Sequence, residues 1–201
     1  MLKVGLTGSI AVGKSFVCSV LRELGCHVLD ADVTAREVVA KGTPGLAAIV
    51  REFGEGVLTE AGDLDRKKLG AIVFADKQKR EVLNSIVHPL VIEAQDSWID
   101  EVELSGLDSI AVIDAALMIE SGGYKRFDKL IVVWCNSAIQ LERLMRRDGL
   151  SESDAKKRVA AQMPQDEKKK FADHLIDTSS GFDDTRAQVT NIVRRLKMST
   201  G

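Results

Sequence analysis

The segment 2–24 joins an apolar run, a glycine-bearing loop and an amphipathic run without a gap. Leu2, Val4 and Leu6 belong to the apolar run, which ends at Gly8 and has the composition of a buried β-strand. After the loop, apolar residues recur at helical spacing at positions 16, 17, 20, 21 and 24. The segment therefore predicts a strand, a loop and a helix in immediate succession, and the rest of the chain must be arranged around this unit.

The loop fits the pattern G-x-x-x-x-G-K-[S/T] of a phosphate-binding loop, here called the P-loop. Its backbone N–H groups would point at phosphate oxygens, with the positive end of the following helix behind them. Lys14 can then reach the β- and γ-phosphates, and the Ser15 hydroxyl can ligate Mg²⁺. An ordinary glycine-rich turn is the alternative, but the required strand and helix flank this one. We predict a nucleoside triphosphate site formed by Gly8, Ser9, Ile10, Ala11, Val12, Gly13, Lys14, Ser15 and Phe16.

Composition limits the other classes of function. With 201 residues, 45% of them apolar, the chain can form one α/β domain with a substantial core. A net charge of -2 argues against a general nucleic-acid binder, which would need an excess of basic residues. Cys18, Cys26 and Cys135 lie in apolar patterns without metal-ligand spacing, as buried thiols of a reducing compartment do. Without a leader or an apolar run near 18 residues, we expect a cytoplasmic protein that does not bind membranes.

Four further apolar runs, at 26–30, 109–114, 128–134 and 172–177, have strand character. Between the first two, glycine-rich turns at 42–65 precede helical patterns that extend to about residue 107. Pro89 is expected to interrupt the longer helix and to free His88 from regular packing. A last helix is predicted over 185–196.

These elements predict an α/β, three-layer P-loop NTPase fold with a five-stranded parallel sheet. We expect a single domain over 1–201. Its core would comprise 1–31, 108–135 and 172–201, with a helical insertion at 32–107 and a helical lid at 136–171. The sequence leaves the oligomeric state open; we expect a monomer, with a homo-oligomer as the alternative.

Asp30 and Asp32 follow the second predicted strand. Ligands of a parallel sheet bind at the carboxyl ends of its strands, so both carboxylates should lie at the level of the phosphates. Asp32 could instead cap the helix that follows, although capping explains one carboxylate and not two. We predict that Asp32 is the general base for an attacking hydroxyl, and a share of that role for Asp30 stays open. Asp114 ends the third strand as a Walker B aspartate would, which predicts a place near Mg²⁺, through water.

Arginines gather after the fourth strand. Arg143 and Arg147 are four residues apart, and Arg158 and Gln162 repeat that spacing in the next helical pattern. Single arginines on a helix are usually solvated surface. Two aligned pairs in a helix-turn-helix after the fourth strand favour a lid that neutralises the transferring phosphoryl group. The basic run 168–170 is expected to be a solvated helix face.

Taken in order, these motifs make the chain similar to the dephospho-coenzyme A kinase family over nearly its whole length. The resemblance is carried by the P-loop, Asp30-Ala-Asp32, Leu64-Asp-Arg66, His88-Pro89, Arg143 to Asp148, Arg158 with Gln162, and Ala172-Asp173 leading into Ile176-Asp177. It implies that ATP, with Mg²⁺, phosphorylates the 3′-hydroxyl of the ribose of dephospho-coenzyme A. It also implies catalytic roles for Asp32, Lys14 and Arg143, ATP contacts of Arg147, and an acceptor side formed by Asp32, Arg66, His88, Leu117 and Arg158.

Two departures from the family pattern stand out. Asp177-Thr178 replaces the usual Asp-Asn, which affects the expected contact to adenine, and Ala116-Leu-Met-Ile-Glu120 lacks the usual proline. A nucleoside monophosphate kinase of the same fold is the nearest alternative enzyme. A GTP-dependent switch is the alternative from another class, but its Asn/Thr-Lys-x-Asp motif is not found.

Overall fold

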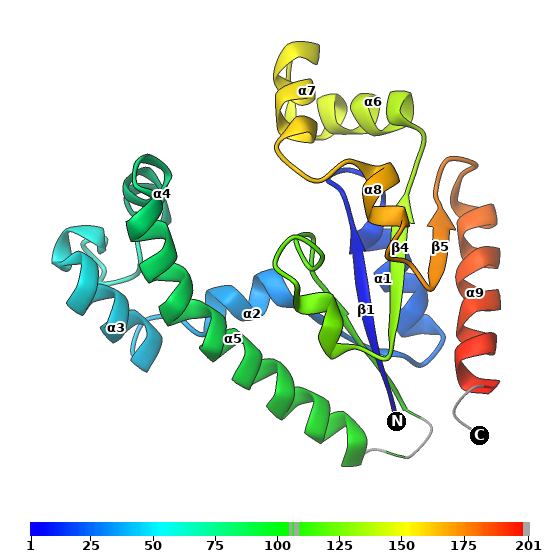
Figure 1. The fold of residues 1–201 in the computed structure, drawn as a ribbon, viewed down its shortest axis with the longest axis horizontal. Helices are drawn as coiled ribbons and strands as arrows, with labels where there is room; N and C mark the ends of the chain where they lie inside the picture. The colour runs from blue at the N-terminus through cyan, green and yellow to red at the C-terminus, as the bar shows by residue number, and fades with distance from the viewer. Residues whose placement is uncertain (105, 107–108, 199–201) are drawn as a thin grey trace. The chain divides into compact units, whose positions relative to one another are not determined.

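The computed structural model describes residues 1–104, 106 and 109–198 (Figure 1). The chain divides into two compact units, one formed by Met1–Leu29 with Glu101–Gly201 and the other by Asp30–Asp100. Each unit has a hydrophobic core of its own.

The larger unit is built on a five-stranded sheet in the order β2-β3-β1-β4-β5. Its strands are β1 (Leu2–Gly8), β2 (His27–Asp30), β3 (Ile110–Asp114), β4 (Lys129–Trp134) and β5 (His174–Asp177). Strand β1 pairs in parallel with β3 and β4, and β4 pairs in parallel with β5. Every residue of β3 is buried, as expected for a continuous apolar strand that is covered on both faces. The predicted parallel sheet is confirmed.

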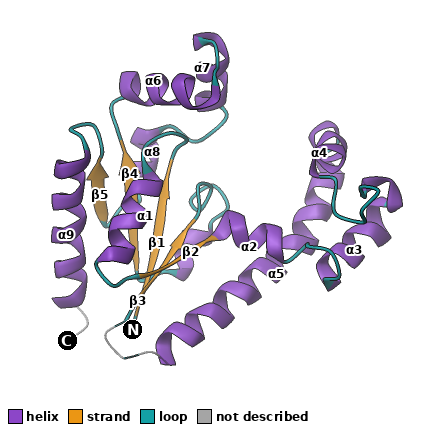
Figure 2. Cartoon of the chain, turned by 180° about the vertical axis from the view of Figure 1, so that it is seen from behind, coloured by secondary structure: helices purple, strands orange, loops and turns teal. Residues whose placement is uncertain are grey.

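Helices cover this sheet and extend beyond its carboxyl edge. Helices α1 (Lys14–Glu23) and α9 (Phe182–Met198) contribute their apolar stripes to the core shared with β1, β3, β4 and β5. Three helices follow β4 in sequence: α6 (Ser137–Asp148), α7 (Glu152–Ala160) and α8 (Gln165–Lys169). Figure 2 shows α6 and α7 beyond the carboxyl end of β4, while α8 leads back towards β5. A short 3-10 helix, η2 (Gly123–Arg126), lies between β3 and β4.

The smaller unit consists of helices around a separate core. It contains α2 (Ala31–Glu37), α3 (Pro44–Phe53), η1 (Glu55–Val57), α4 (Arg66–Ala75) and most of α5 (Lys77–Leu104). Val39, Ile49, Val57 and Leu69 are buried at its centre. The helix starts are encoded locally: the Thr43 hydroxyl caps α3, and Pro44 at its first position lacks only an N–H that would have no helical partner.

The predicted break at Pro89 is wrong, because α5 continues from Lys77 to Leu104 with Pro89 inside it. Proline removes the N–H that the Ser85 carbonyl would accept within a regular helix. Both Ser85 and Pro89 are exposed, so water can solvate that carbonyl. His88 is therefore an exposed residue of a regular helix and is not released from it.

None of the helices in the described part of the chain combines the length and the apolar character that spanning a bilayer requires.

Candidate active site

The P-loop occupies the tight connection between β1 and α1. At Gly8, an added Cβ would lie 2.5 Å from the carbonyl oxygen of Val133, so a side chain cannot be accommodated where the loop leaves the sheet. Gly13 caps α1 with φ 89°, a conformation that glycine adopts readily. Ala11 also lies in the left-handed region, with φ 60°, and is the only non-glycine residue there among the described residues. The loop therefore has a specific backbone shape that its side chains do not all favour.

Lys14 lies against Asp114 at the carboxyl edge of the sheet. The Lys14 Nζ is 2.5 Å from Asp114 Oδ1, and the two side chains are 18% and 11% exposed. The register of β1 with β3 pairs Leu6 with Asp114, which brings the carboxylate close to the start of the P-loop. The structure thus brings together two residues that the sequence predicted for phosphate and metal binding.

A buried thiol completes this group. The Cys18 Sγ donates a hydrogen bond to Asp114 Oδ2 at 3.4 Å. Burial, with the negative charge of Asp114 as the next cause, raises the pKa of the Cys18 thiol to about 12. The thiol therefore stays protonated at neutral pH and acts as a hydrogen-bond donor to the carboxylate.

Arg143 of α6 reaches the P-loop through Thr178. Its guanidinium donates to the Thr178 hydroxyl and to the Thr178 carbonyl, each at 2.8 Å. The hydroxyl in turn donates to the Val12 carbonyl at 2.7 Å. Thr178 is 4% exposed, and both functions of its hydroxyl are used by these two partners. The residue that replaces the usual asparagine therefore joins the lid arginine to the loop.

Arg147 and Arg158 meet on a different residue, Asp148. The Arg147 Nε lies 2.7 Å from Asp148 Oδ1, and the Arg158 guanidinium lies 2.6 Å from Oδ2. The hydrogen bond from Arg147, and after it the charges of both arginines, lower the pKa of the Asp148 carboxyl. Both arginine side chains are more than half exposed, so this group closes the α6–α7 turn. Their substrate contacts stay predictions.

In the smaller unit, Asp30 and Asp32 have different surroundings. Asp30 Oδ1 accepts hydrogen bonds from the Asp32 and Val33 N–H groups, at 2.8 and 3.2 Å. The alternative that Asp32 caps α2 is therefore wrong, because the helix begins at Ala31 and Asp30 caps it. The carboxylate of Asp32 is exposed and makes no hydrogen bond or ion pair with the described residues.

The other predicted acceptor residues are exposed. Arg66, at the start of α4, donates to the carbonyl of Arg36 at 3.3 Å and so joins α4 to the end of α2. His88 lies on the surface of α5. Leu117, in the loop after β3 of the larger unit, is 54% exposed. Their contacts with an acceptor stay predictions.

The predicted solvated face at 168–170 is wrong for Lys168, which is fully buried. Its Nζ donates to the Ala116 carbonyl at 2.7 Å and lies 2.9 Å from Glu120 Oε1. The same carboxylate oxygen accepts the Met163 N–H at 3.2 Å. The Ala116 carbonyl also accepts the Thr7 hydroxyl, at 3.2 Å. The buried ammonium therefore ties the end of the lid to the loop after β3, and no local sequence signal separates Lys168 from Lys169 and Lys170.

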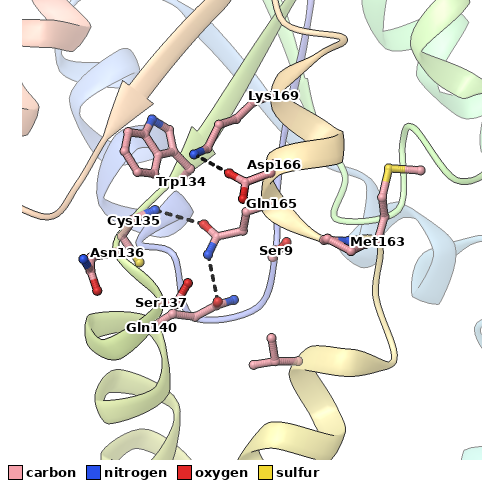
Figure 3. A pocket seen from close by; sticks show the side chains of 12 residues that line it. Ser9, Trp134, Cys135, Asn136, Ser137, Gln140, Met163, Gln165, Asp166 and Lys169 are labelled. Atoms are coloured by element: carbon pink, nitrogen blue, oxygen red, sulfur yellow. Dashed lines mark hydrogen bonds and ion pairs between the residues drawn. The ribbon is translucent and has the colours of Figure 1, made fainter.

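A pocket of about 360 Å³ lies between the P-loop, the end of β4 and the lid helices (Figure 3). Two glutamine side chains, Gln140 and Gln165, form part of its wall, and sequence reasoning missed both. Lys169 also lines the pocket, with its Nζ 3.7 Å from the centre of the Trp134 ring and 2.8 Å from Asp166 Oδ1. The pocket shows that the lid and the P-loop face each other closely within this unit.

Metal ligands are few. In the ranges that the structure describes, no three His, Cys, Asp or Glu side chains gather closely enough to hold a metal ion. Two separate oxygen donors of the kind that Mg²⁺ prefers are present, the exposed Ser15 hydroxyl at the start of α1 and the Asp114 carboxylate.

Comparison with known proteins gives one consistent result. The family model for dephospho-CoA kinase matches residues 2–184. The dephospho-CoA kinase of Bacillus licheniformis is 47% identical over 192 residues, covering 96% of this chain and 95% of that protein. TT1252 from Thermus thermophilus superposes with a TM-score of 0.85 at 29% identity, over 96% of both chains. Dephospho-CoA kinase from Campylobacter jejuni gives 0.74 at 28% identity, over 99% of this chain and 98% of that one.

The pair formed by the buried Lys168 and the partly exposed Glu120 should contribute measurably to stability. Lys168→Met keeps most of the side-chain volume but leaves the Glu120 carboxylate without its cation. We expect the free energy of unfolding to fall by about 2 kcal/mol, less than for a fully buried pair, because the Glu120 side chain is 24% exposed and keeps the Met163 N–H. Urea denaturation monitored by circular dichroism measures this change in the free energy of unfolding.

Lys170→Met is the matched control, because Lys170 lies two residues further on in an exposed pair with Glu167. Its denaturation midpoint should equal that of the unaltered protein. Equal losses in the two variants would contradict the role given to the buried ammonium.

Proposed function

Because the chain belongs to the dephospho-CoA kinase family, we propose that its P-loop site transfers the γ-phosphoryl group of ATP to the 3′-hydroxyl of the dephospho-CoA ribose. The products are CoA and ADP, and the reaction is the last step of CoA synthesis. The observation that carries the assignment is the convergence of Lys14 and Arg143 on one loop at the start of α1. Two cations beside a set of backbone N–H groups are suited to a polyphosphate.

The proposed mechanism is an in-line displacement, in which the transferring phosphoryl group lies between the attacking and leaving oxygens. Such a transition state needs little covalent help from the protein, and its rate depends on alignment and on compensation of negative charge. The P-loop amides and Lys14 would hold the β- and γ-phosphates. Arg143, fixed by two hydrogen bonds to Thr178, would face the nucleotide without first having to become ordered.

Mg²⁺ is proposed as the cofactor, held by the Ser15 hydroxyl and, through water, by Asp114. When bound, it would supply positive charge to the β- and γ-phosphate oxygens. Asp114 would then have a second role besides its pair with Lys14. Its carboxylate keeps the ammonium of Lys14 at the carboxyl edge of the sheet, next to the loop that binds the phosphates.

Asp32 is the proposed general base. Its carboxylate is exposed and has no partner among the described residues, so it is available to accept the proton of the 3′-hydroxyl. Asp30 is already engaged by two backbone N–H groups. Arg66, His88 and Leu117, with Arg158, are proposed to form the acceptor side.

A coupled assay of ADP release tests the proposed reaction, with Mg·ATP and dephospho-CoA, AMP, shikimate or no acceptor. We expect ADP only with dephospho-CoA, and CoA as the product identified by mass spectrometry. Equal ADP release with another acceptor or without any would overturn the assigned substrate.

Asp32→Asn should lower turnover by about 10²-fold or more, the range for loss of a general base, with little change in the KM for ATP. Asp30→Asn is the matched control, because asparagine caps a helix about as well as aspartate and the change removes the same charge. Its turnover should stay close to that of the unaltered enzyme. Both variants are measured by steady-state kinetics. A lower turnover in Asp30→Asn than in Asp32→Asn would argue against Asp32 as the base.

Thr178→Val preserves the shape of the side chain but removes the hydroxyl that joins Arg143 to Val12. We expect kcat/KM for ATP to fall by about tenfold, since one hydrogen bond to a charged group and one to a buried carbonyl are lost. Thr178→Ser restores the hydroxyl and should recover most of the lost activity. Loss of activity in the serine variant as large as in the valine variant would show that the hydroxyl is not the cause.

A further inference from the structure

Three glutamine side chains connect the lid to the P-loop, and phosphoryl transfer as derived above uses none of them. Gln162, between α7 and α8, accepts the Ile10 N–H at its Oε1, at 2.7 Å. Gln140 of α6 donates from its Nε2 to the Ile10 carbonyl at 2.8 Å. The N–H and the carbonyl of Ile10 are therefore both bound by lid residues, one from the segment after α7 and one from α6.

The third glutamine fixes the orientation of Gln140. The Gln165 Nε2 donates to Gln140 Oε1 at 2.8 Å, and Gln165 Oε1 accepts the Cys135 N–H at 3.0 Å (Figure 3). Gln140 is only 2% exposed, and with Oε1 accepting from Gln165 its Nε2 is left to donate to Ile10. This chain of hydrogen bonds begins at Cys135, directly after β4. The strand therefore sets the position of the Gln140 amide that donates to Ile10.

The residue after Ile10 is Ala11, the alanine with φ 60°. For a residue with a Cβ this conformation is unfavourable, because the Cβ approaches a backbone carbonyl oxygen. Its φ torsion is set by the orientation of the Ile10 carbonyl, which Gln140 holds. On the other side, the Val12 carbonyl is held by the Thr178 hydroxyl. Ala11 thus lies between two anchored carbonyls.

We propose that Gln140 and Gln162, oriented by Gln165, are positioning residues that hold the P-loop in its phosphate-binding shape against the preference of Ala11. The lid then contributes to ATP affinity through the loop backbone, in addition to any contact of its arginines with the nucleotide. The inference rests on the proposed function only in requiring that the P-loop binds ATP.

The first test needs no nucleotide. Gln162→Met keeps the length of the side chain but removes the acceptor of the Ile10 N–H. We expect the Ile10 amide to exchange with solvent about tenfold faster or more, measured by NMR hydrogen exchange on the labelled protein. Lys156→Met, on the exposed face of α7, is the control and should leave this rate unchanged. An unchanged Ile10 rate in Gln162→Met would overturn the proposal.

The second test is a double-mutant cycle with Ala11→Gly, which removes the Cβ that makes the left-handed conformation unfavourable. ATP affinity is measured by displacement of a fluorescent ATP analogue. With Ala11 present, Gln162→Met should weaken ATP binding by about five- to tenfold, and in the Ala11→Gly protein by less than about twofold. Gln140→Met gives a second cycle through the carbonyl of Ile10, should Gln162→Met fold poorly.

The outcomes are distinct. If Gln162→Met weakened ATP binding equally with alanine and with glycine at position 11, the proposed coupling between the glutamines and Ala11 would be overturned. Neither the exchange rate of the Ile10 amide nor the affinity for ATP depends on the molecule that receives the phosphoryl group. A protein that passes both tests but does not phosphorylate dephospho-CoA would therefore contradict the proposed function and leave this inference standing.

Discussion

The contact between the Lys14 ammonium and the Asp114 carboxylate depends on the register of two parallel strands, and the rest of the site is arranged around the same edge. Because β1 and β3 run in parallel, the loop after one and the last residue of the other come together. The neighbouring pairs of β1 with β4 and β4 with β5 then bring Trp134 and Thr178 to the same end. The sheet order thus makes neighbours of residues that are a hundred or more positions apart in the sequence.

The lid is tied to this edge by several polar contacts. Arg143 binds Thr178, two glutamines bind Ile10, and the buried Lys168 binds Glu120. Hydrogen bonds of this kind are directional, so they define the position of a helix more narrowly than an apolar face would. A site that must align three phosphates with a hydroxyl gains more from helices held in fixed positions than from additional buried apolar surface.

Much of the fold could be predicted because its signals are local. The P-loop lies within eight consecutive residues, and each strand is a short apolar run of its own. The first residue of a helix is less well defined by such patterns, which is why Asp32 could be considered as an alternative cap of α2 although the cap lies at Asp30. The role of Lys168 depends on Glu120, 48 residues earlier, and that of Gln162 on Ile10, 152 residues earlier. Nothing in the composition around Lys168 distinguishes it from Lys169 or Lys170.

The protonated thiol of Cys18 has a consequence for the chemical durability of the site. Electrophiles and peroxides react with thiolates, and a pKa of about 12 leaves on the order of one Cys18 thiol in 10⁵ ionised at pH 7. Burial is the main reason why this sulfur stays neutral, and the carboxylate that pairs with Lys14 adds to the effect. A cysteine beside the phosphate site is therefore a poor target for covalent inhibitors and a poor sensor of oxidative stress, and nucleotide chemistry can continue there while more acidic thiols of the cell are modified.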